Sequence, residues 1–232
     1  MNFPLSSVSF FCPAYFEEKN LPILIPKVVS LLLKITNKFE IIIIEDGSPD
    51  KTGKVADELS NQYPCVKVIH HHRNLGYGAS LRDGFCNSKY EYIMYTDGDN
   101  QYDINEFIPY IHLLSNADIL SGYVTKKALT PLRKIQSVVF NLLVKILFLV
   151  NIKDINCSMK IYKRKVLDSI SIKSTSAFID AEMLIKAKRL GFSIAQFPVT
   201  HYPRINGVAS GSNPSVIIST IKDLIKFRLG LL

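Results

Sequence analysis

The sequence predicts an α/β fold built on a mostly parallel sheet that is flanked by helices. Three observations lead to this prediction: short apolar runs alternate with amphipathic segments, the runs are continuously apolar, and polar motifs follow them. Strands of a parallel sheet that is covered on both faces have this continuous apolar character. With 232 residues, of which 47% are hydrophobic, the chain is long enough to bury a sizeable core.

The first half of the chain supplies most of the predicted elements. The runs at 8–12, 39–44, 66–70, 92–95 and 117–120 are expected to be strands, and the second of these holds four consecutive isoleucines. The intervening segments predict helices at 21–35, 50–63, 79–88 and 105–114, with Asp50 or Thr52 as the N-cap of the second.

The second half of the chain is more apolar and predicts two amphipathic helices. Residues 132–150 place Lys134, Ser137, Asn141 and Lys145 on one narrow stripe of an otherwise apolar helix. This segment is shorter than the roughly 20 apolar residues that cross a bilayer. It fits a buried core helix, which is the commoner case, or a helix that lies in a membrane interface. Residues 216–232 form the second candidate.

The positive charge of the chain is concentrated in one segment. Residues 126–173 hold eleven Lys or Arg against two Asp, a net charge of +9, which leaves −1 for the rest of the chain with its total of +8. Such a surplus predicts an anionic partner, either phosphates, acidic lipid or nucleic acid, or else a solvated Lys-rich face. Few aromatic side chains are interleaved with these charges, so we expect no nucleic-acid partner.

The cysteines and the N-terminus bear on the compartment of the protein. The four cysteines are scattered without a Cys-x-x-Cys pair, which predicts neither a disulfide framework nor a zinc site and favours a reducing cytosolic compartment. The first residues lack the charged and apolar regions of a secretory signal. We therefore expect a cytoplasmic protein.

The motif that carries most chemistry follows the fourth predicted strand. Asp97 and Asp99 flank Gly98 at the end of a buried run, and buried carboxylates are costly unless a positive group meets them. A divalent cation such as Mg²⁺ takes oxygen ligands of this kind together with substrate phosphates. A polar turn is the alternative, because Asp-Gly is a common turn signal. Polar motifs follow the first three strands as well, and ligands of such sheets bind at the carboxyl ends of strands.

Several other chemistries are excluded or weak. The chain has no G-x-x-x-x-G-K-[ST] phosphate loop and no G-x-S-x-G nucleophile elbow. The glycines Gly76 and Gly78 resemble a dinucleotide fingerprint, but Leu81 stands where its third glycine belongs. The tract His70-His71-His72 lacks the spacing of metal ligands and fits a strand that runs into a loop.

The order of the strand-end motifs resembles that of glycosyltransferase family 2, whose members have the GT-A fold. These motifs are PAYFE at 13–17, EDGSPDKT at 45–52, NLGYGA at 74–79 and DGDNQ at 97–101. Three later motifs, DINCSMK at 154–160, FIDAE at 178–182 and HYPRING at 201–207, are similar to its dolichol-phosphate mannosyltransferase branch. Two departures are Phe16, where Asn is usual, and Cys157-Ser158-Met159, which replaces a Ser/Cys-Gly-Phe pattern.

The resemblance implies a donor site for a nucleotide-diphosphate sugar such as GDP-mannose or UDP-glucose. Asp46 would contact the base or ribose, and Mg²⁺ or Mn²⁺ would be held against the donor diphosphate by Asp97, Asp99 and Gln101. The nucleotide-sugar pocket would be completed by Pro13, Tyr15, Glu17, Gly76 and Gly78.

The resemblance also implies a polyprenyl or dolichyl phosphate acceptor, with Arg133 and Arg204 gripping phosphates. An anionic acceptor needs no general base, only positioning, and this would use the basic surplus. The alternative acceptor is a glycan hydroxyl, which requires a base, and Asp180 and Glu182 are then the candidates. A third hypothesis is a non-catalytic, membrane-associated nucleotide-binding module.

These expectations give a domain plan. We expect a catalytic domain over residues 1–212, divided into a nucleotide-sugar and metal half (1–121) and an acceptor half (122–212) that carries the helix 132–150. A C-terminal amphipathic helix then occupies 213–232. We expect the enzyme to lie peripherally on the cytosolic face of a membrane, through these helices or through a partner protein.

Overall fold

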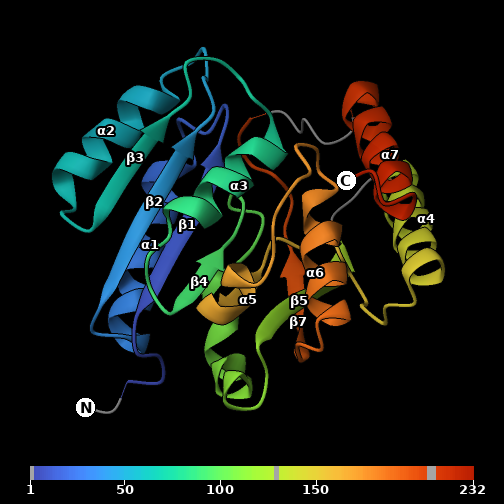
Figure 1. The fold of residues 1–232 in the computed structure, drawn as a ribbon. Helices are drawn as coiled ribbons and strands as arrows, with labels where there is room; N and C mark the ends of the chain where they lie inside the picture. The colour runs from blue at the N-terminus through green and yellow to red at the C-terminus, as the bar shows by residue number, and fades with distance from the viewer. Residues whose placement is uncertain (1–2, 128–130, 208–212) are drawn as a thin grey trace.

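The computed structural model describes residues 3–127, 131–207 and 213–232. They form one seven-stranded sheet in the order β3-β2-β1-β4-β6-β5-β7, with helices on both faces (Figure 1). β6 runs antiparallel to both of its neighbours, and every other described pairing is parallel. The α/β fold with a mostly parallel sheet is confirmed. The strands are β1 (Val8–Ala14), β2 (Phe39–Glu45), β3 (Val66–His70), β4 (Tyr92–Tyr95), β5 (Ile119–Lys127), β6 (Lys160–Lys163) and β7 (Ile194–His201).

The isoleucine run in β2 shows why this sheet is buried on both faces. Ile41 and Ile43 belong to the core on one face, together with residues of α1 (Leu21–Ile35), α2 (Thr52–Gln62) and the 3-10 helix η1 (Ile104–Ser115). Ile42 and Ile44 belong to the core on the other face, where α3 (Tyr77–Asn87) and α6 (Ile179–Arg189) pack. Successive residues of a strand point to opposite faces, so a strand between two cores must be apolar at every position.

The predicted elements of the first half agree with the structure within two residues, with two exceptions. η1 is a 3-10 helix containing Pro109, and the strand expected at 117–120 is β5, which begins at Ile119 and continues to Lys127. Lys51, and not Asp50 or Thr52, is the N-cap residue of α2, but the Oδ1 atom of Asp50 accepts a hydrogen bond from the Thr52 amide at 3.0 Å.

Four elements of the second half were not predicted from the sequence: β6, α5 (Arg164–Asp168), α6 and β7. β6 has only four residues, two of them lysines, and β7 contains Pro198, so neither has the pattern of a buried parallel strand.

The two predicted amphipathic helices lie side by side at the end of the molecule farthest from α1 and α2 (Figure 1). They are α4 (Pro131–Phe148) and α7 (Pro214–Arg228). The rings of Phe148 and Phe227 meet at a centroid distance of 5.4 Å on the inner side of the pair. Among the described residues, none of the helices has the length and apolar character to cross a membrane.

Candidate active site

A cavity of about 860 Å³ lies where the carboxyl ends of β1, β2 and β4 face α4 and α7. The parallel arrangement brings these strand ends together, and backbone hydrogen bonds tie the loops to one another, for example from the Asp46 amide to the Ala14 carbonyl at 3.0 Å. Most of the predicted site residues line this cavity: Pro13, Tyr15, Glu17, Asp46, Gly76, Asp97, Asp99, Gln101, Asp180 and Arg204.

Three predicted residues are not brought to the cavity wall. A Cβ atom on Gly78 would lie 2.4 Å from the backbone of Thr175, so this glycine allows α3 to pack closely against the loop before α6. Glu182 is buried and accepts hydrogen bonds from the backbone amides of Lys173 and Ser174 at 2.9 and 2.8 Å, which holds that same loop. The side chain of Arg133 lies outside the described residues.

The loop after β4 carries two carboxylates, Asp97 and Asp99, which differ in their hydrogen-bond partners. Asp97 Oδ1 is buried and has no hydrogen-bond partner among the described residues. Burial, followed by the negative charges of Asp99 and Asp180, raises the pKa of Asp97 from 3.8 to about 7. A buried carboxylate in this condition is stabilised by any cation that reaches it.

Arg204, which follows β7, is the positive side chain that faces this acidic end. Its Nη2 atom lies 2.6 Å from Asp99 Oδ2, and its Nη1 atom lies 3.3 Å from Glu17 Oε1. Burial nevertheless raises the pKa of Glu17 from 4.5 to about 7, although hydrogen bonding by Asn20 and the charge of Arg204 oppose this. The sequence motifs 13–17, 97–101 and 201–207 therefore meet in one cluster.

These residues fit a divalent cation that is also bound by substrate. Among the described residues, no three His, Cys, Asp or Glu side chains are grouped as a complete metal site. Asp97 offers an unpartnered buried oxygen, and Asp99 lies beside it with its Oδ1 atom accepting from the Gln101 amide at 3.0 Å. The Gln101 side-chain amide donates to the Tyr202 carbonyl at 2.9 Å. Two carboxylates completed by substrate phosphates are a usual arrangement for Mg²⁺.

Asp46, which also lines the cavity, is held by two backbone amides and by His71. Its Oδ1 atom accepts from the Leu75 amide at 2.8 Å and meets His71 Nδ1 at 2.7 Å, and its Oδ2 atom accepts from the Gly76 amide at 2.9 Å. His71 Nε2 lies 2.9 Å from Asp83 of α3. The sequence reading did not assign His71 a part in the site. One signal in the sequence could have pointed to His71. Glu45 and His70 are paired at the ends of β2 and β3, so the residues that follow them, Asp46 and His71, are expected to lie close together.

Three basic residues of the segment 126–173 have partners within the protein. Lys160 is fully buried and lies 2.6 Å from Asp180, and Lys165 pairs with Asp118 at 2.7 Å. The guanidinium of Arg164 donates to the carbonyls of Ser88 and Tyr90. The fold therefore directs these three residues to separate protein partners.

Comparison with known proteins decides the family of the chain. A family model described as Glycosyl transferase family 2 matches residues 9–171. The chain belongs to glycosyltransferase family 2. It is thus a glycosyltransferase, and the resemblance of its strand-end motifs to this family is confirmed.

Curated relatives of this family 2 glycosyltransferase act on lipid phosphates according to their names. A dolichyl-phosphate beta-glucosyltransferase of Trichomonas vaginalis is 29% identical over 96% of this chain and 73% of its own length. An undecaprenyl-phosphate 4-deoxy-4-formamido-L-arabinose transferase of Pseudomonas fluorescens is 28% identical over 96% of this chain. The chain spans 65% of that second relative.

Solved structures confirm the GT-A fold of this family 2 glycosyltransferase. Glucosyl-3-phosphoglycerate synthase of Mycobacterium tuberculosis, in complex with Mn²⁺, UDP and glucosyl-3-phosphoglycerate, has a TM-score of 0.75 at 17% identity. The match covers 98% of this chain and 81% of that chain. The same enzyme in complex with Mn²⁺ and UDP-glucose has a TM-score of 0.74.

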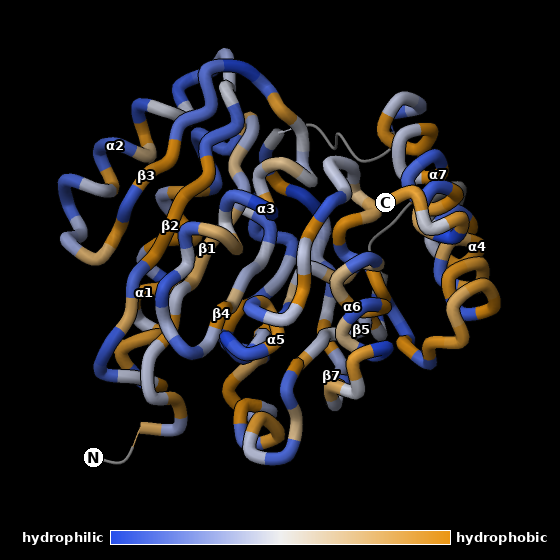
Figure 2. Tube along the Cα trace, viewed as in Figure 1, coloured by the Kyte–Doolittle hydropathy of each residue, from blue (hydrophilic) through white to orange (hydrophobic). Residues whose placement is uncertain are grey.

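The cavity of the family 2 glycosyltransferase changes character toward its outer end. There it is lined by apolar residues on the facing sides of α4 and α7, among them Val139, Phe140, Leu143, Ile217 and Ile221. Figure 2 shows α4 as one of the most apolar surface helices. A single cavity therefore joins an acidic side to an apolar side.

Proposed function

We propose that this enzyme transfers a hexose from a nucleotide-diphosphate sugar of the GDP-mannose or UDP-glucose type to a polyprenyl or dolichyl phosphate. The observation that carries this proposal is the two-ended cavity, which offers carboxylates for a charged donor and apolar helix faces for an isoprenoid acceptor. The names of the curated relatives support the same acceptor class.

The donor would lie along the strand ends. Asp46, held by His71 and two backbone amides, is placed to accept a hydrogen bond from the base or ribose, and Pro13 and Tyr15 line the same cavity. Mg²⁺ or Mn²⁺ held by Asp97 and Asp99, with Gln101 beside them, would neutralise the charge that develops on the leaving nucleoside diphosphate. The structures of glucosyl-3-phosphoglycerate synthase with Mn²⁺ and UDP support this part of the proposal.

The reaction needs positioning more than proton transfer. An acceptor phosphate oxygen, already anionic, forms a bond to C1 of the hexose while the bond from C1 to the diphosphate oxygen breaks, and its electrons leave with the nucleoside diphosphate. Attack from the opposite face of the sugar inverts the configuration at C1. Arg204, between Asp99 and Glu17, is the described guanidinium that lines the cavity, and we assign it to binding phosphate together with Arg133.

We further propose that the enzyme lies peripherally on the cytosolic face of a membrane. The outward side of α4 exposes Ile135, Val138, Leu142 and Ile146, each by more than half. α7 adds a second apolar row at Ile218, Ile221 and Ile225. Apolar surface of this extent on neighbouring helices is typical of a membrane or protein interface. Ile135 and Ile221 of this surface also line the cavity, and a lipid acceptor would enter there.

The direct test is sugar transfer to lipid. Purified protein is incubated with labelled UDP-glucose or GDP-mannose, Mn²⁺ or Mg²⁺ and a short polyprenyl phosphate, and the label in the lipid extract is measured. We expect transfer from one of these donors, a loss of at least about 100-fold in Asp99→Ala and a complete loss with EDTA. Asp168→Asn, which changes an exposed aspartate outside the cavity, is the control. Unimpaired transfer by Asp99→Ala, or no transfer from any common donor, contradicts the proposal.

A further inference from the structure

The floor of the cavity holds a buried ion pair that the proposed reaction leaves without a function. Lys160 on β6 is fully buried, and its ammonium lies 2.6 Å from Asp180 Oδ1 and 3.1 Å from the Tyr95 hydroxyl. The same ammonium donates to the Cys157 carbonyl. Lysine has three N–H donors, and these three partners use all of them. Lys160 therefore has no donor left for a substrate and acts only on its neighbours.

The two oxygens of Asp180 differ in what they contact. Oδ1 accepts from Lys160 and from the Tyr95 hydroxyl, so it is fully engaged with the protein. Oδ2 has one partner among the described residues, the Tyr77 hydroxyl, at the long distance of 3.4 Å. Asp180 and Tyr77 both line the cavity, and the charge of Asp180 is close enough to Asp97 to raise its pKa. An acceptor oxygen is thus held rigidly beside the carboxylates of the donor site.

This arrangement suits a binding residue. The Lys160 ammonium and the Tyr95 hydroxyl both engage Oδ1, which fixes the carboxylate and leaves Oδ2 to accept a further hydrogen bond. A carboxylate oxygen held in this way is a strong hydrogen-bond acceptor for a hydroxyl group. The proposed acceptor attacks through a phosphate oxygen, so the hydroxyls in this cavity come from the donor. Those of its ribose belong with Asp46 in the proposed function, which leaves the hydroxyls of the hexose for Asp180.

We propose that Asp180 binds a hydroxyl group of the donor hexose and so helps to select the sugar, with Lys160 as its positioning residue. This inference rests on the nucleotide-sugar donor of the proposed function and does not depend on the lipid acceptor. In this proposal Asp180 acts in donor specificity, whereas a glycan-hydroxyl acceptor would call on it as a base.

The test separates sugar binding from nucleotide binding. Wild type and Asp180→Asn are titrated by calorimetry with UDP and UDP-glucose, and with GDP and GDP-mannose, in the presence of Mn²⁺. We expect nucleoside diphosphate affinity to stay within about twofold and affinity for the preferred nucleotide sugar to fall on the order of tenfold to a hundredfold, as for loss of a charged hydrogen bond. Deoxy analogues of the preferred sugar identify the hydroxyl, because the analogue that lacks it should bind wild type and Asp180→Asn equally.

Two further variants distinguish loss of the proposed contact from misfolding of the protein. Asp180→Asn leaves Lys160 buried without its counter-ion, so the double variant Lys160→Met, Asp180→Asn removes both charges and should show the same selective loss. Asp118→Asn, which removes another ion-paired aspartate outside the cavity, should leave both affinities unchanged. Equal loss for nucleotide and nucleotide sugar, or unchanged affinity with a reduced turnover number, overturns the inference and returns Asp180 to a structural or a base role. Absence of nucleotide-sugar binding in wild type overturns the proposed donor as well.

Discussion

At the scale of single residues, the acidic end of the cavity depends on side chains that orient one another. Both ring nitrogens of His71 face carboxylate oxygens, those of Asp46 at 2.7 Å and of Asp83 at 2.9 Å, so the ring links Asp46 to α3 and fixes it. Phe16 has a φ angle of 61°, in the left-handed region, where Asn is tolerated more readily than a bulky aromatic residue. The departure of this chain from Asn at that position therefore carries a conformational cost.

Replacing His71 tests whether Asp46 must be held from behind. We expect His71→Ala to weaken UDP or GDP binding on the order of tenfold, because Asp46 loses a charged hydrogen bond and can turn away from the nucleotide. Calorimetric titration of the folded variant measures this effect. His72→Ala, an exposed neighbour in the same tract, is the matched control and should bind as wild type does. A folded His71→Ala protein with wild-type nucleotide affinity contradicts the prediction.

The site residues that could be predicted from the sequence share one property. Asp46, Asp97 and Asp99 follow directly on apolar strands, and neighbouring parallel strands end at the same edge of a sheet. Gly78 and Glu182 lie in motifs of the family but face the loop before α6, and nothing in the sequence reports the direction of their side chains. The sequence also gives no sign that Lys160 is buried against Asp180, twenty residues away.

At the scale of elements, α4 has the reverse of the usual surface-helix pattern. Asn141 faces inward and accepts the Ile155 amide at 2.9 Å, whereas Leu142 and Ile146 are exposed by 54% and 62%. Val144 and Phe148 complete the buried side. The sequence left open whether this segment is a core helix or an interfacial helix. The structure gives it a narrow buried side and a wide exposed apolar side, and this exposure supports the proposed membrane face.

The outward side of α4 gives a prediction about membrane binding. We expect wild-type protein to float with anionic vesicles and the double variant Leu142→Glu, Ile146→Glu to stay largely in the soluble fraction, because it places two charges on the apolar side. Both side chains are exposed, so the free energy of unfolding should change little. Ile23→Glu, Leu33→Glu on α1 is the matched control, since it charges two other exposed apolar positions. Wild type that remains soluble, or flotation lost equally in the control, counts against the proposed membrane face.

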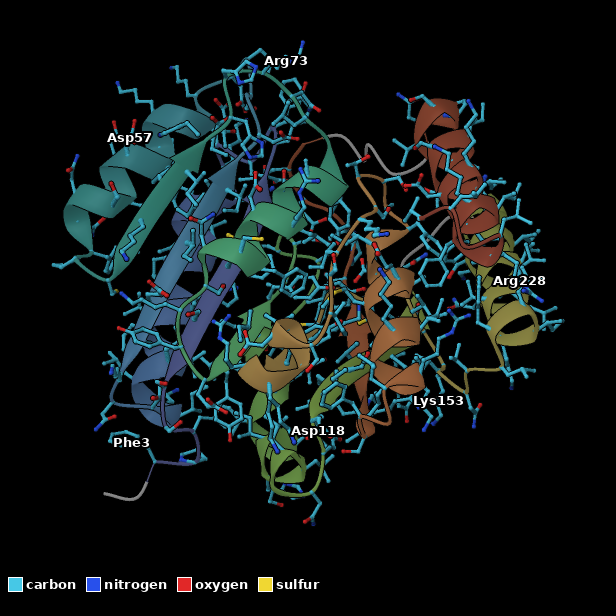
Figure 3. All side chains as sticks on the ribbon, viewed as in Figure 1. Phe3, Asp57, Arg73, Asp118, Lys153 and Arg228 are labelled. Atoms are coloured by element: carbon cyan, nitrogen blue, oxygen red, sulfur yellow. The ribbon has the colours of Figure 1, made fainter. Side chains whose placement is uncertain are left out.

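At the scale of the whole molecule, the candidate active site and the ion pair of Asp118 lie at opposite ends of the strands. Figure 3 shows Arg73 at the end of the molecule where β2 and β3 finish, and Asp118 at the opposite end. Asp118 Oδ2 accepts from the amide and hydroxyl of Ser193 at 3.0 and 2.8 Å, and its Oδ1 atom lies 2.7 Å from Lys165. This one side chain ties the beginnings of β5 and β7 to α5.

Asp118 should give the protein a measurable dependence of stability on pH. Partial burial raises its pKa, but hydrogen bonds from Lys165 and Ser193 outweigh this and lower the pKa from 3.8 to about 2. Because the folded-state pKa is below the unfolded one, its stabilisation is present above about pH 4 and is lost as pH falls toward 2.

The measurement is the free energy of unfolding in urea at several pH values. Asp118→Asn should lower it by about 1 to 2 kcal/mol at pH 7, after allowance for solvent screening. The difference from wild type should shrink between pH 4 and pH 2.5, where wild type loses the same interaction. Asp168→Asn, at an exposed position, should follow the wild-type curve. A difference between wild type and Asp118→Asn that does not change with pH contradicts the assignment.

The sequence by itself determined the parallel sheet, the order of its strand-end motifs and the acidic pair Asp97 and Asp99, because these follow from local patterns of apolar and polar residues. The tertiary structure alone decided which long-range partners meet, such as Lys160 with Asp180 and Arg204 with Asp99. It also decided which side of α4 is exposed. The physical reason is that hydrophobic periodicity is a property of neighbouring residues, whereas the pairing of buried charges depends on strand register and on how separate elements pack.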